Sequence, residues 1–168
     1  MNNKLLSQVD VRDQAQVESA AQEILAQMKA EGKTFHEVLG LSEGFIERLY
    51  AMAYSYYNQG KYPLALDYFR LLTTMNTKNA KYFFGLASTL HQMKEYDSAG
   101  ATFMMAFCLE PTHPLSVYYA ADSYLKDNQI DSTKECLEIA IEIAGNRPEH
   151  AHLKERCLLI KKTLKDNK

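Results

Sequence analysis

The chain has 168 residues, of which 46% are hydrophobic and 24% are charged, and its formal net charge is −2. These proportions are ordinary for a soluble globular protein, and the length suits one domain with a continuous core. A charge this close to neutral argues against a nucleic-acid partner, because nucleic-acid binders usually concentrate basic side chains on one surface.

Residues 1–15 are mostly polar, and we expect them to form a flexible N-terminus. They include no apolar run of signal-peptide length, and no later stretch is apolar enough to span a membrane. We therefore expect a cytoplasmic protein without direct membrane insertion. The three cysteines (Cys108, Cys136 and Cys157) are widely spaced within predicted helices and are interpreted as small buried apolar residues.

Residues 16–45 form the next predicted segment. From Gln16 to Ala30 the apolar residues recur at the spacing of one helical face, and Gly32 ends this helix. A short apolar connector follows at 34–41, and Ser42 suits the N-cap of the next helix.

Three stretches of the chain fall into register when the sequence is shifted by 34 residues. They are 46–79, 80–113 and 114–147. Each has a small residue at the same offset (Ala53, Ala87 or Ala121), with large apolar residues at fixed positions around it. This period and pattern are typical of tetratricopeptide repeats (TPRs), which are pairs of helices. Such pairs stack into a curved solenoid with an inner wall that can hold another polypeptide.

The last segment, 148–168, begins in phase with the repeats and then departs from them. Glu155 stands at the offset of the small residue, and the apolar residues form a single stripe with a charged opposite face. These features are typical of a terminal capping helix with a short tail. The sequence thus predicts an all-α TPR solenoid of three helix pairs with an N-terminal helix and a C-terminal capping helix.

The inner wall of the predicted solenoid is aromatic and has almost no basic charge. In a TPR pair the first helix lines the concave side, and its fifth, ninth and twelfth positions should point into the groove. The predicted peptide-binding groove therefore consists of Tyr50, Tyr54, Tyr57, Phe84, Ser88, His91, Tyr118, Asp122 and Leu125, with Tyr119 beside them.

The alternative is that these aromatic residues belong to the core. Against it, the core face of the first helix is already filled by Leu49, Met52, Ala53 and Tyr56, which leaves the groove tyrosines on another face. Tyrosine also suits a wet peptide-binding surface, because it combines a broad apolar ring, few rotamers and a hydroxyl group.

The run Leu49–Gly60 (LYAMAYSYYNQG) resembles the first repeat of the class II type III secretion chaperones. These are small TPR proteins that hold translocator subunits in bacteria with an injection apparatus. The lead-in at 32–42 (GKTF…LGLS) is similar to that family too, as are Phe83, Gly85–Ala87 and Ala106–Phe107. The resemblance spans about residues 16 to 160.

The resemblance implies a bacterial cytoplasmic chaperone that binds an extended segment of hydrophobic translocators, larger or smaller, in its concave groove. The client would stay soluble until export. The family's groove contacts are the tyrosines of the first repeat, which correspond to Tyr50, Tyr54 and Tyr57. Phe84 and Tyr118 are added from helical geometry. Thr133 and Lys94 depart from the family pattern, since they replace a small alanine and a turn glycine.

The family often dimerises through its N-terminal region. That property implies a homodimer, with dimer contacts at Val17, Ile24, Leu25 and Met28. Packing of this helix against the first repeat of its own chain is the alternative, and the sequence leaves both open.

The sequence has no catalytic pattern. His36–Glu37 is not followed by a second histidine at metal-ligand spacing, and there is no glycine-rich phosphate loop, GxSxG or CxxC motif. We therefore expect neither an enzyme nor a metal or cofactor site, and we interpret all five histidines as surface or groove residues.

A TPR solenoid is compatible with two other functions. A TPR co-chaperone that reads a carboxylate-terminated tail needs basic residues on its inner wall, and this wall is aromatic. A TPR scaffold or regulatory subunit of a transcription or secretion complex stays open as the alternative function.

Overall fold

The computed structural model describes residues 9, 10 and 12–166. Most of the expected flexible N-terminus lies outside the described residues, as do the last two residues of the C-terminal tail. Throughout the described part the regular secondary structure is helical, and the predicted all-α class is confirmed. The helices are α2 (Gln14–Glu31), α3 (Phe35–Val38), α4 (Glu43–Asn58), α5 (Tyr62–Met75), α6 (Ala80–Gln92), α7 (Tyr96–Leu109), α8 (Leu115–Lys126), α9 (Ile130–Ala144), the 3-10 helix η1 (Pro148–His150) and α10 (Ala151–Asp166).

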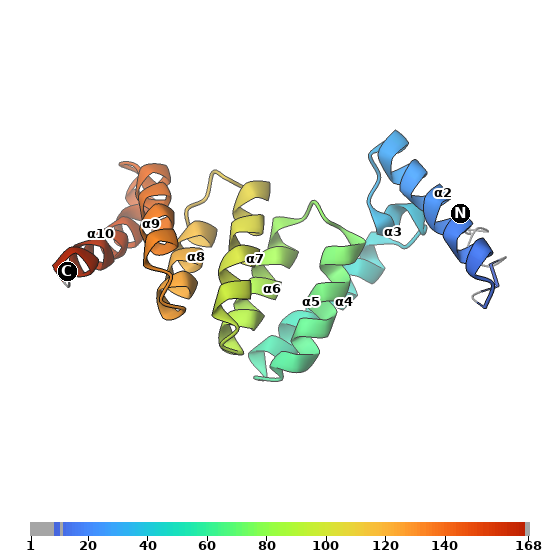
Figure 1. Cartoon of the computed structure of the whole chain (residues 1–168), viewed down its shortest axis with the longest axis horizontal. Coiled ribbons are helices and arrows are strands. Elements are labelled where there is room, and N and C mark those ends of the chain that lie inside the picture. Colours follow the sequence, from blue (N-terminus) through green and yellow to red (C-terminus); the bar gives the residue numbers. More distant parts are fainter. Residues whose placement is uncertain (1–8, 11, 167–168) are drawn as a thin grey trace.

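The helices from α4 to α10 form an elongated array in which each packs against the next along the chain (Figure 1). The consecutive pairs are α4 with α5, α6 with α7, and α8 with α9. The two ends of the chain lie at opposite ends of this array (Figure 1). The predicted TPR-type solenoid is therefore confirmed.

The boundaries of α2 and α4 follow from capping residues that can be recognised in the sequence. Asp13 and Ser42 cap α2 and α4, and their side-chain oxygens accept hydrogen bonds from the backbone N–H groups of Ala15 and Phe45, among others. Gly32 ends α2 with a left-handed backbone (φ 62°). These residues end α2 and start α4, so that the tyrosine-rich run lies within a single helix.

The turn inside each helix pair has one residue with positive φ, and the three positions are 34 residues apart. They are Gly60 (φ 71°), Lys94 (φ 65°) and Asn128 (φ 59°). Glycine takes this conformation without steric cost and asparagine tolerates it, whereas lysine does so with strain. The departure at Lys94 therefore leaves the turn geometry intact at an energetic cost.

The departure at Thr133 is accommodated in the core. Thr133 is fully buried, and its hydroxyl donates a hydrogen bond of 2.8 Å to the Gln129 carbonyl one turn earlier in α9. Because the one added polar group has a partner, the third pair packs as the others do.

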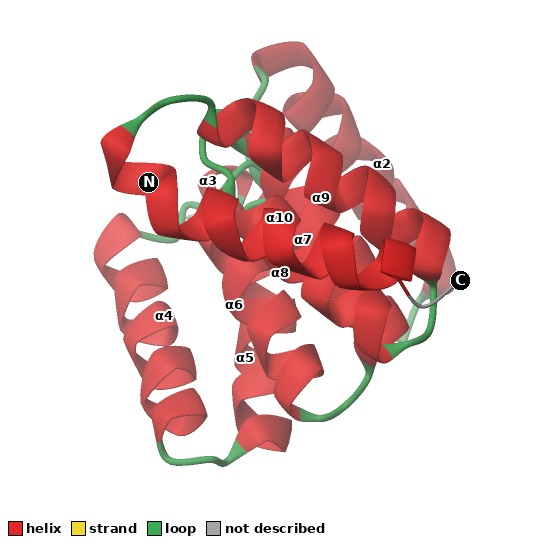
Figure 2. Ribbon diagram, turned by 90° about the vertical axis from the view of Figure 1, so that its left-hand side faces the viewer, coloured by secondary structure: helices red, strands yellow, loops and turns green. Residues whose placement is uncertain are grey.

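The helix α10 covers the end of the array, as the view from the C-terminal end shows (Figure 2). Cys157 is fully buried against the main hydrophobic cluster, and Leu153, Ile160 and Leu164 pack around it. At the edges, Lys161 forms an ion pair of 2.7 Å with Glu138 of α9, and Lys154 donates to the Gly145 carbonyl at 2.6 Å. An apolar stripe thus closes the core while charged groups face water.

The N-terminal segment is joined to the array through a buried histidine. The sequence predicted that His36 is a surface or groove residue. This prediction is wrong, because His36 is only 1% exposed. Its Nε2 lies 3.0 Å from Glu43 Oε1, and its Nδ1 lies 3.1 Å from the Met75 carbonyl oxygen. His36 therefore connects α3 with the first turn of α4 and the end of α5. His150 is buried as well, whereas Cys108 is exposed, contrary to both expectations.

Candidate peptide-binding groove

A cavity of about 470 Å³ opens between α4, α6 and α8. Tyrosines of α4 form one side, α6 runs through the middle, and Tyr119 with the start of α8 forms the other side. Phe69 of α5 and Phe103 of α7 are almost fully buried and reach the cavity from behind. The lining residues are Tyr50, Tyr54, Tyr57, Phe69, Ala80, Lys81, Phe84, Gly85, Ser88, His91, Gln92, Phe103, Glu110, His113, Leu115, Ser116 and Tyr119.

The cavity brings together most of the residues that the repeat phase places in the groove. Seven of the predicted ten line it: Tyr50, Tyr54, Tyr57, Phe84, Ser88, His91 and Tyr119. Asp122 stands just behind them and contacts His91, and the half-buried Leu125 is outside the lining. The first two repeats thus supply the groove positions that the helical geometry predicts.

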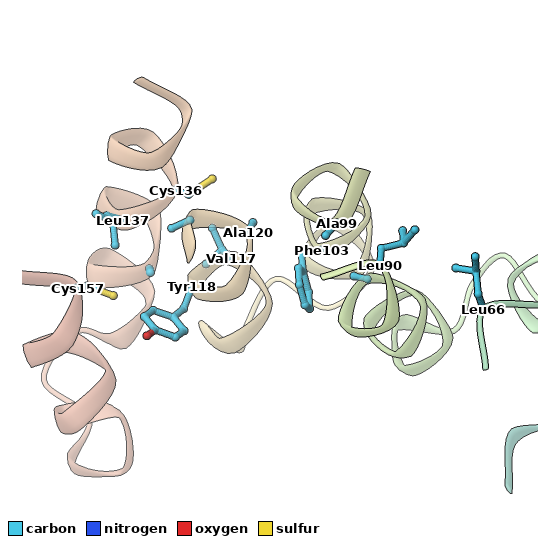
Figure 3. Close-up of a cluster of buried hydrophobic side chains, with 13 residues drawn as sticks. Leu66, Leu90, Ala99, Phe103, Val117, Tyr118, Ala120, Cys136, Leu137 and Cys157 are labelled. Atoms are coloured by element: carbon cyan, nitrogen blue, oxygen red, sulfur yellow. The ribbon is translucent and has the colours of Figure 1, made fainter. Parts of the chain in front are cut away.

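Tyr118 is the exception, because it belongs to the core. It is 6% exposed and lies on the side of α8 nearest Cys157 (Figure 3). The Arg156 guanidinium lies over its ring, 5.5 Å from the centroid. The cause is α10, which covers the face of α8 that carries Tyr118. The neighbouring Tyr119, about 100° round the helix, takes the groove position instead.

The sequence interpretation missed the groove contribution of the second helices. Phe69 and Phe103 have equivalent offsets in their repeats, and the sequence analysis does not place them in the groove. Phe69 reaches the cavity because residue 85 is glycine: a Cβ there would lie 2.2 Å from Phe69 Cε1. The sequence signal for this contact is a glycine, Gly85, that follows the aromatic Phe69 by 16 positions.

The aromatic side chains of the cavity wall, with the buried Tyr82 behind it, form two groups. In the first, the Tyr50 ring lies 6.4 Å from Tyr54, 6.2 Å from Phe69 and 5.6 Å from Tyr82, measured between centroids. In the second, Phe103 stacks on Tyr119 at 5.5 Å, and Phe84 meets both rings edge-on. These mutual contacts hold the rings in place before any ligand binds, which lowers the ordering cost of binding.

The phenol groups of Tyr50 and Tyr57 keep their protons at neutral pH. Burial raises the pKa of Tyr50 and that of Tyr57 above the ordinary value for tyrosine. Their hydroxyls can therefore donate hydrogen bonds as well as accept them, as an extended backbone requires.

The charges at one end of the cavity are paired within the protein. His91 Nε2 lies 2.9 Å from Asp122 Oδ2, and Lys126 Nζ lies 3.0 Å from the same oxygen. The Tyr96 ring packs against His91 and lies beneath the Lys126 ammonium group. The polar groups at this end of the cavity are thus bonded to one another.

Within the described residues, no group of three or more His, Cys, Asp or Glu side chains is placed to hold a metal ion. None of the described helices has the length and apolar character needed to cross a membrane.

The residues predicted to form a dimer contact divide into two kinds. Leu25 is 54% exposed and Val17 is exposed as well, whereas Met28 is half-buried. Ile24 is only 7% exposed, so it packs within its own chain and is not free to contact a partner. An α2 contact with another molecule would therefore use Val17 and Leu25.

The stacked helix pairs have the architecture of a TPR solenoid, and an aromatic cavity opens between their first helices. The Tetratricopeptide repeat family profile agrees, matching residues 46–79 and 80–111.

More particularly, the chain is similar to translocator chaperones of type III secretion. It is 28% identical over 148 residues to the chaperone protein SicA of Salmonella typhimurium, covering 88% of this chain and 87% of SicA. The structure resembles the type III secretion chaperone SycD of Yersinia enterocolitica in complex with a peptide of the translocator YopD. That match has a TM-score of 0.70 and 25% identity, and it covers 75% of this chain and 96% of SycD.

PcrH of Pseudomonas aeruginosa, solved with the chaperone binding region of PopD, matches equally well. Its TM-score is 0.70 and its identity 25%, with coverage of 76% of this chain and 96% of PcrH. SycD has also been solved as an alternative dimer. The resemblance to class II type III secretion chaperones is thus confirmed.

Proposed function

We propose that this protein is a bacterial chaperone, and not an enzyme, that binds an extended segment of hydrophobic type III secretion translocators in the aromatic cavity. It keeps the client soluble and competent for secretion. One observation carries the proposal: the cavity wall is built from preorganised aromatic rings, in a chain similar to SycD and PcrH, which bind translocator segments. The name of SicA as a chaperone supports the same function.

The mechanism is shielding. Apolar side chains of the client lie between the rings of Tyr50, Tyr54, Phe84 and Tyr119, and its backbone bonds to the phenol hydroxyls and to Ser88. Each fully buried aliphatic anchor contributes about 1.5–3 kcal/mol, against which stand the costs of ordering the client. A few such anchors give micromolar to nanomolar affinity, which is tight enough to hold the client and weak enough to release it.

The remaining features complete the proposal. The protein acts in the cytoplasm, where its clients are made. The segments 46–79, 80–113 and 114–147 are the three repeats, 16–45 is the dimerisation segment and 148–168 is the capping helix and tail. A homodimer is supported by the dimer structure of SycD. Its contact would use Val17 and Leu25, which are exposed on α2.

The test is the double substitution of Tyr50 and Tyr54 by alanine. We expect loss of the translocator from co-expression pull-downs, because both rings belong to the first aromatic group of the cavity. The melting temperature should fall only slightly, since Tyr54 is mostly exposed and Tyr50 is half-buried.

Tyr56→Ala is the matched control on the same helix. Tyr56 packs against Tyr68 outside the cavity, with ring centroids 5.4 Å apart, so this variant should keep its client. If the double variant unfolded, the rings of Tyr50 and Tyr54 would be part of the hydrophobic core. A pull-down that captures only cytosolic signalling or transcription proteins would instead favour a scaffold or regulatory subunit.

A further inference from the structure

A second cavity of about 430 Å³ adjoins the aromatic one. It lies between the loop after α2, the start of α3, the α5–α6 loop and the end of α7. Its lining is mostly polar: Gly32, Thr34, Glu37, Asn76, Lys78, Asn79, Ala80, Lys81, Leu109 and Glu110. Ala80, Lys81 and Glu110 line both cavities, so the two meet at the start of α6 and the end of α7. We call these three residues the junction.

The other charged groups of the polar cavity already have partners. Glu37 Oε2 accepts hydrogen bonds of 2.6 Å from both the backbone N–H and the hydroxyl of Thr34. These bonds lower the pKa of Glu37 and keep it ionised in place. Lys78 Nζ donates to the Gly32 carbonyl. Both groups are thus tied to the local fold through these bonds.

The same is true of the ionisable groups in the aromatic cavity. His91 is engaged with Asp122 and Lys126, and His113 Nδ1 accepts a hydrogen bond of 3.3 Å from the Leu115 N–H. Within the part of the chain that the structure describes, Lys81 and Glu110 form neither an ion pair nor a side-chain hydrogen bond, with each other or with any other group. They are the unpaired charges of the two cavities, and their signs are opposite.

We propose that the client segment continues from the aromatic cavity across the junction into the polar cavity. There Lys81 and Glu110 select the charged residues that flank its apolar anchors: an acidic side chain pairs with Lys81 and a basic one with Glu110. This inference rests on the proposed function and adds to it a rule for which segments are accepted. Opposite unpaired charges at one end of a groove whose other charged groups have partners also fix the direction in which the chain lies.

The experiment is a selection from a phage-displayed random peptide library on the wild-type protein and on the Lys81→Glu and Glu110→Lys variants. Wild type should select peptides with acidic and basic residues beside an apolar anchor. Lys81→Glu should lose the acidic preference and gain a basic one, and Glu110→Lys should do the reverse. A wild-type-selected peptide should bind Lys81→Glu about two- to fivefold more weakly, as expected for an exposed pair.

Matched controls come from α10, where Lys162 and Glu155 are exposed and lie outside both cavities. Lys162→Glu and Glu155→Lys make the same changes in net charge and should select the same peptides as wild type. Identical flanking residues in all five selections would overturn the inference.

A further selection on the Tyr50→Ala and Tyr54→Ala double variant tests the proposed function separately from the charge selection at the junction. Peptides that need the tyrosines but show no charge preference contradict the junction alone. Failure of wild type to select any peptide, or selection of peptides that ignore the tyrosines, contradicts the proposed function and the junction with it.

Discussion

At the scale of single residues, Gly85 determines the floor of the groove. Its missing side chain leaves room for the Phe69 ring, which is 1% exposed and packs on Tyr50. We expect Gly85→Ala to push this ring from its position, because the added Cβ would lie only 2.2 Å from Phe69 Cε1. The free energy of unfolding should fall by about 1–3 kcal/mol, as overpacking usually costs, and client affinity should fall with it.

Gly44→Ala is the control for that substitution. Gly44 lies in the first turn of α4, and a Cβ there would meet nothing nearer than Arg48 Nη1 at 3.9 Å. Alanine should therefore be neutral or stabilising at this site, by up to about 1 kcal/mol. Urea unfolding and client titration of both variants decide the matter, and a Gly85→Ala variant as stable as wild type would show that Phe69 has room to move.

At the scale of elements, the turn between α6 and α7 is strained where its two counterparts are not. Lys94 has φ 65°, in the position that Gly60 and Asn128 occupy in the other pairs. We predict that Lys94→Gly stabilises the protein by about 0.5–1 kcal/mol, because glycine removes the clash of Cβ with the backbone. Asn128→Gly should gain less, since asparagine tolerates this conformation. A larger gain at residue 128, measured by urea unfolding, would contradict this explanation.

In the N-terminal elements, the sequence draws attention to the pair His36–Glu37 but does not reveal what the two residues do. His36–Glu37 drew attention as an incomplete metal-ligand pattern, and the two residues instead organise α3. Glu37 caps the start of α3 through Thr34, while His36 ties it to Glu43 and to Met75, 39 residues away. Sequence spacing reveals the local cap but not the long-range bond, because the latter depends on how α5 returns past α3.

At the scale of the whole molecule, the sequence predicts the positions that recur in every repeat, but not the contacts made by elements that occur only once. The 34-residue period places Tyr50, Tyr54 and Tyr57, because α4 packs against α5 of its own repeat and α6 of the next. It fails at Tyr118, where the non-repeating α10 covers α8 and exchanges the roles of Tyr118 and Tyr119. The sequence does not predict the junction either, because Lys81 and Glu110 line the same cavities only when α7 ends beside the start of α6.

The response to alkaline pH tests the packing along the whole array. Burial raises the pKa of Cys136 in α9 and of Cys157 in α10 from 9.0 to about 11. It also raises the pKa of Tyr82 in α6 and of Tyr124 in α8. The folded state therefore holds these protons more tightly than the unfolded chain does. By linkage, their contribution to stability is complete below about pH 9 and is lost as the pH rises towards about 11.

We predict that the free energy of unfolding, measured by urea titration, is insensitive to these groups at pH 7–8 and declines steadily above about pH 9. Cys157→Ala should make the alkaline decline shallower, although it lowers stability at neutral pH by opening a small gap beneath α10. Cys108→Ser should leave the decline unchanged, because Cys108 is exposed. An alkaline slope that is the same in Cys157→Ala and wild type would mean that α10 opens before the thiol ionises, so that the cap and the repeats do not unfold as one unit.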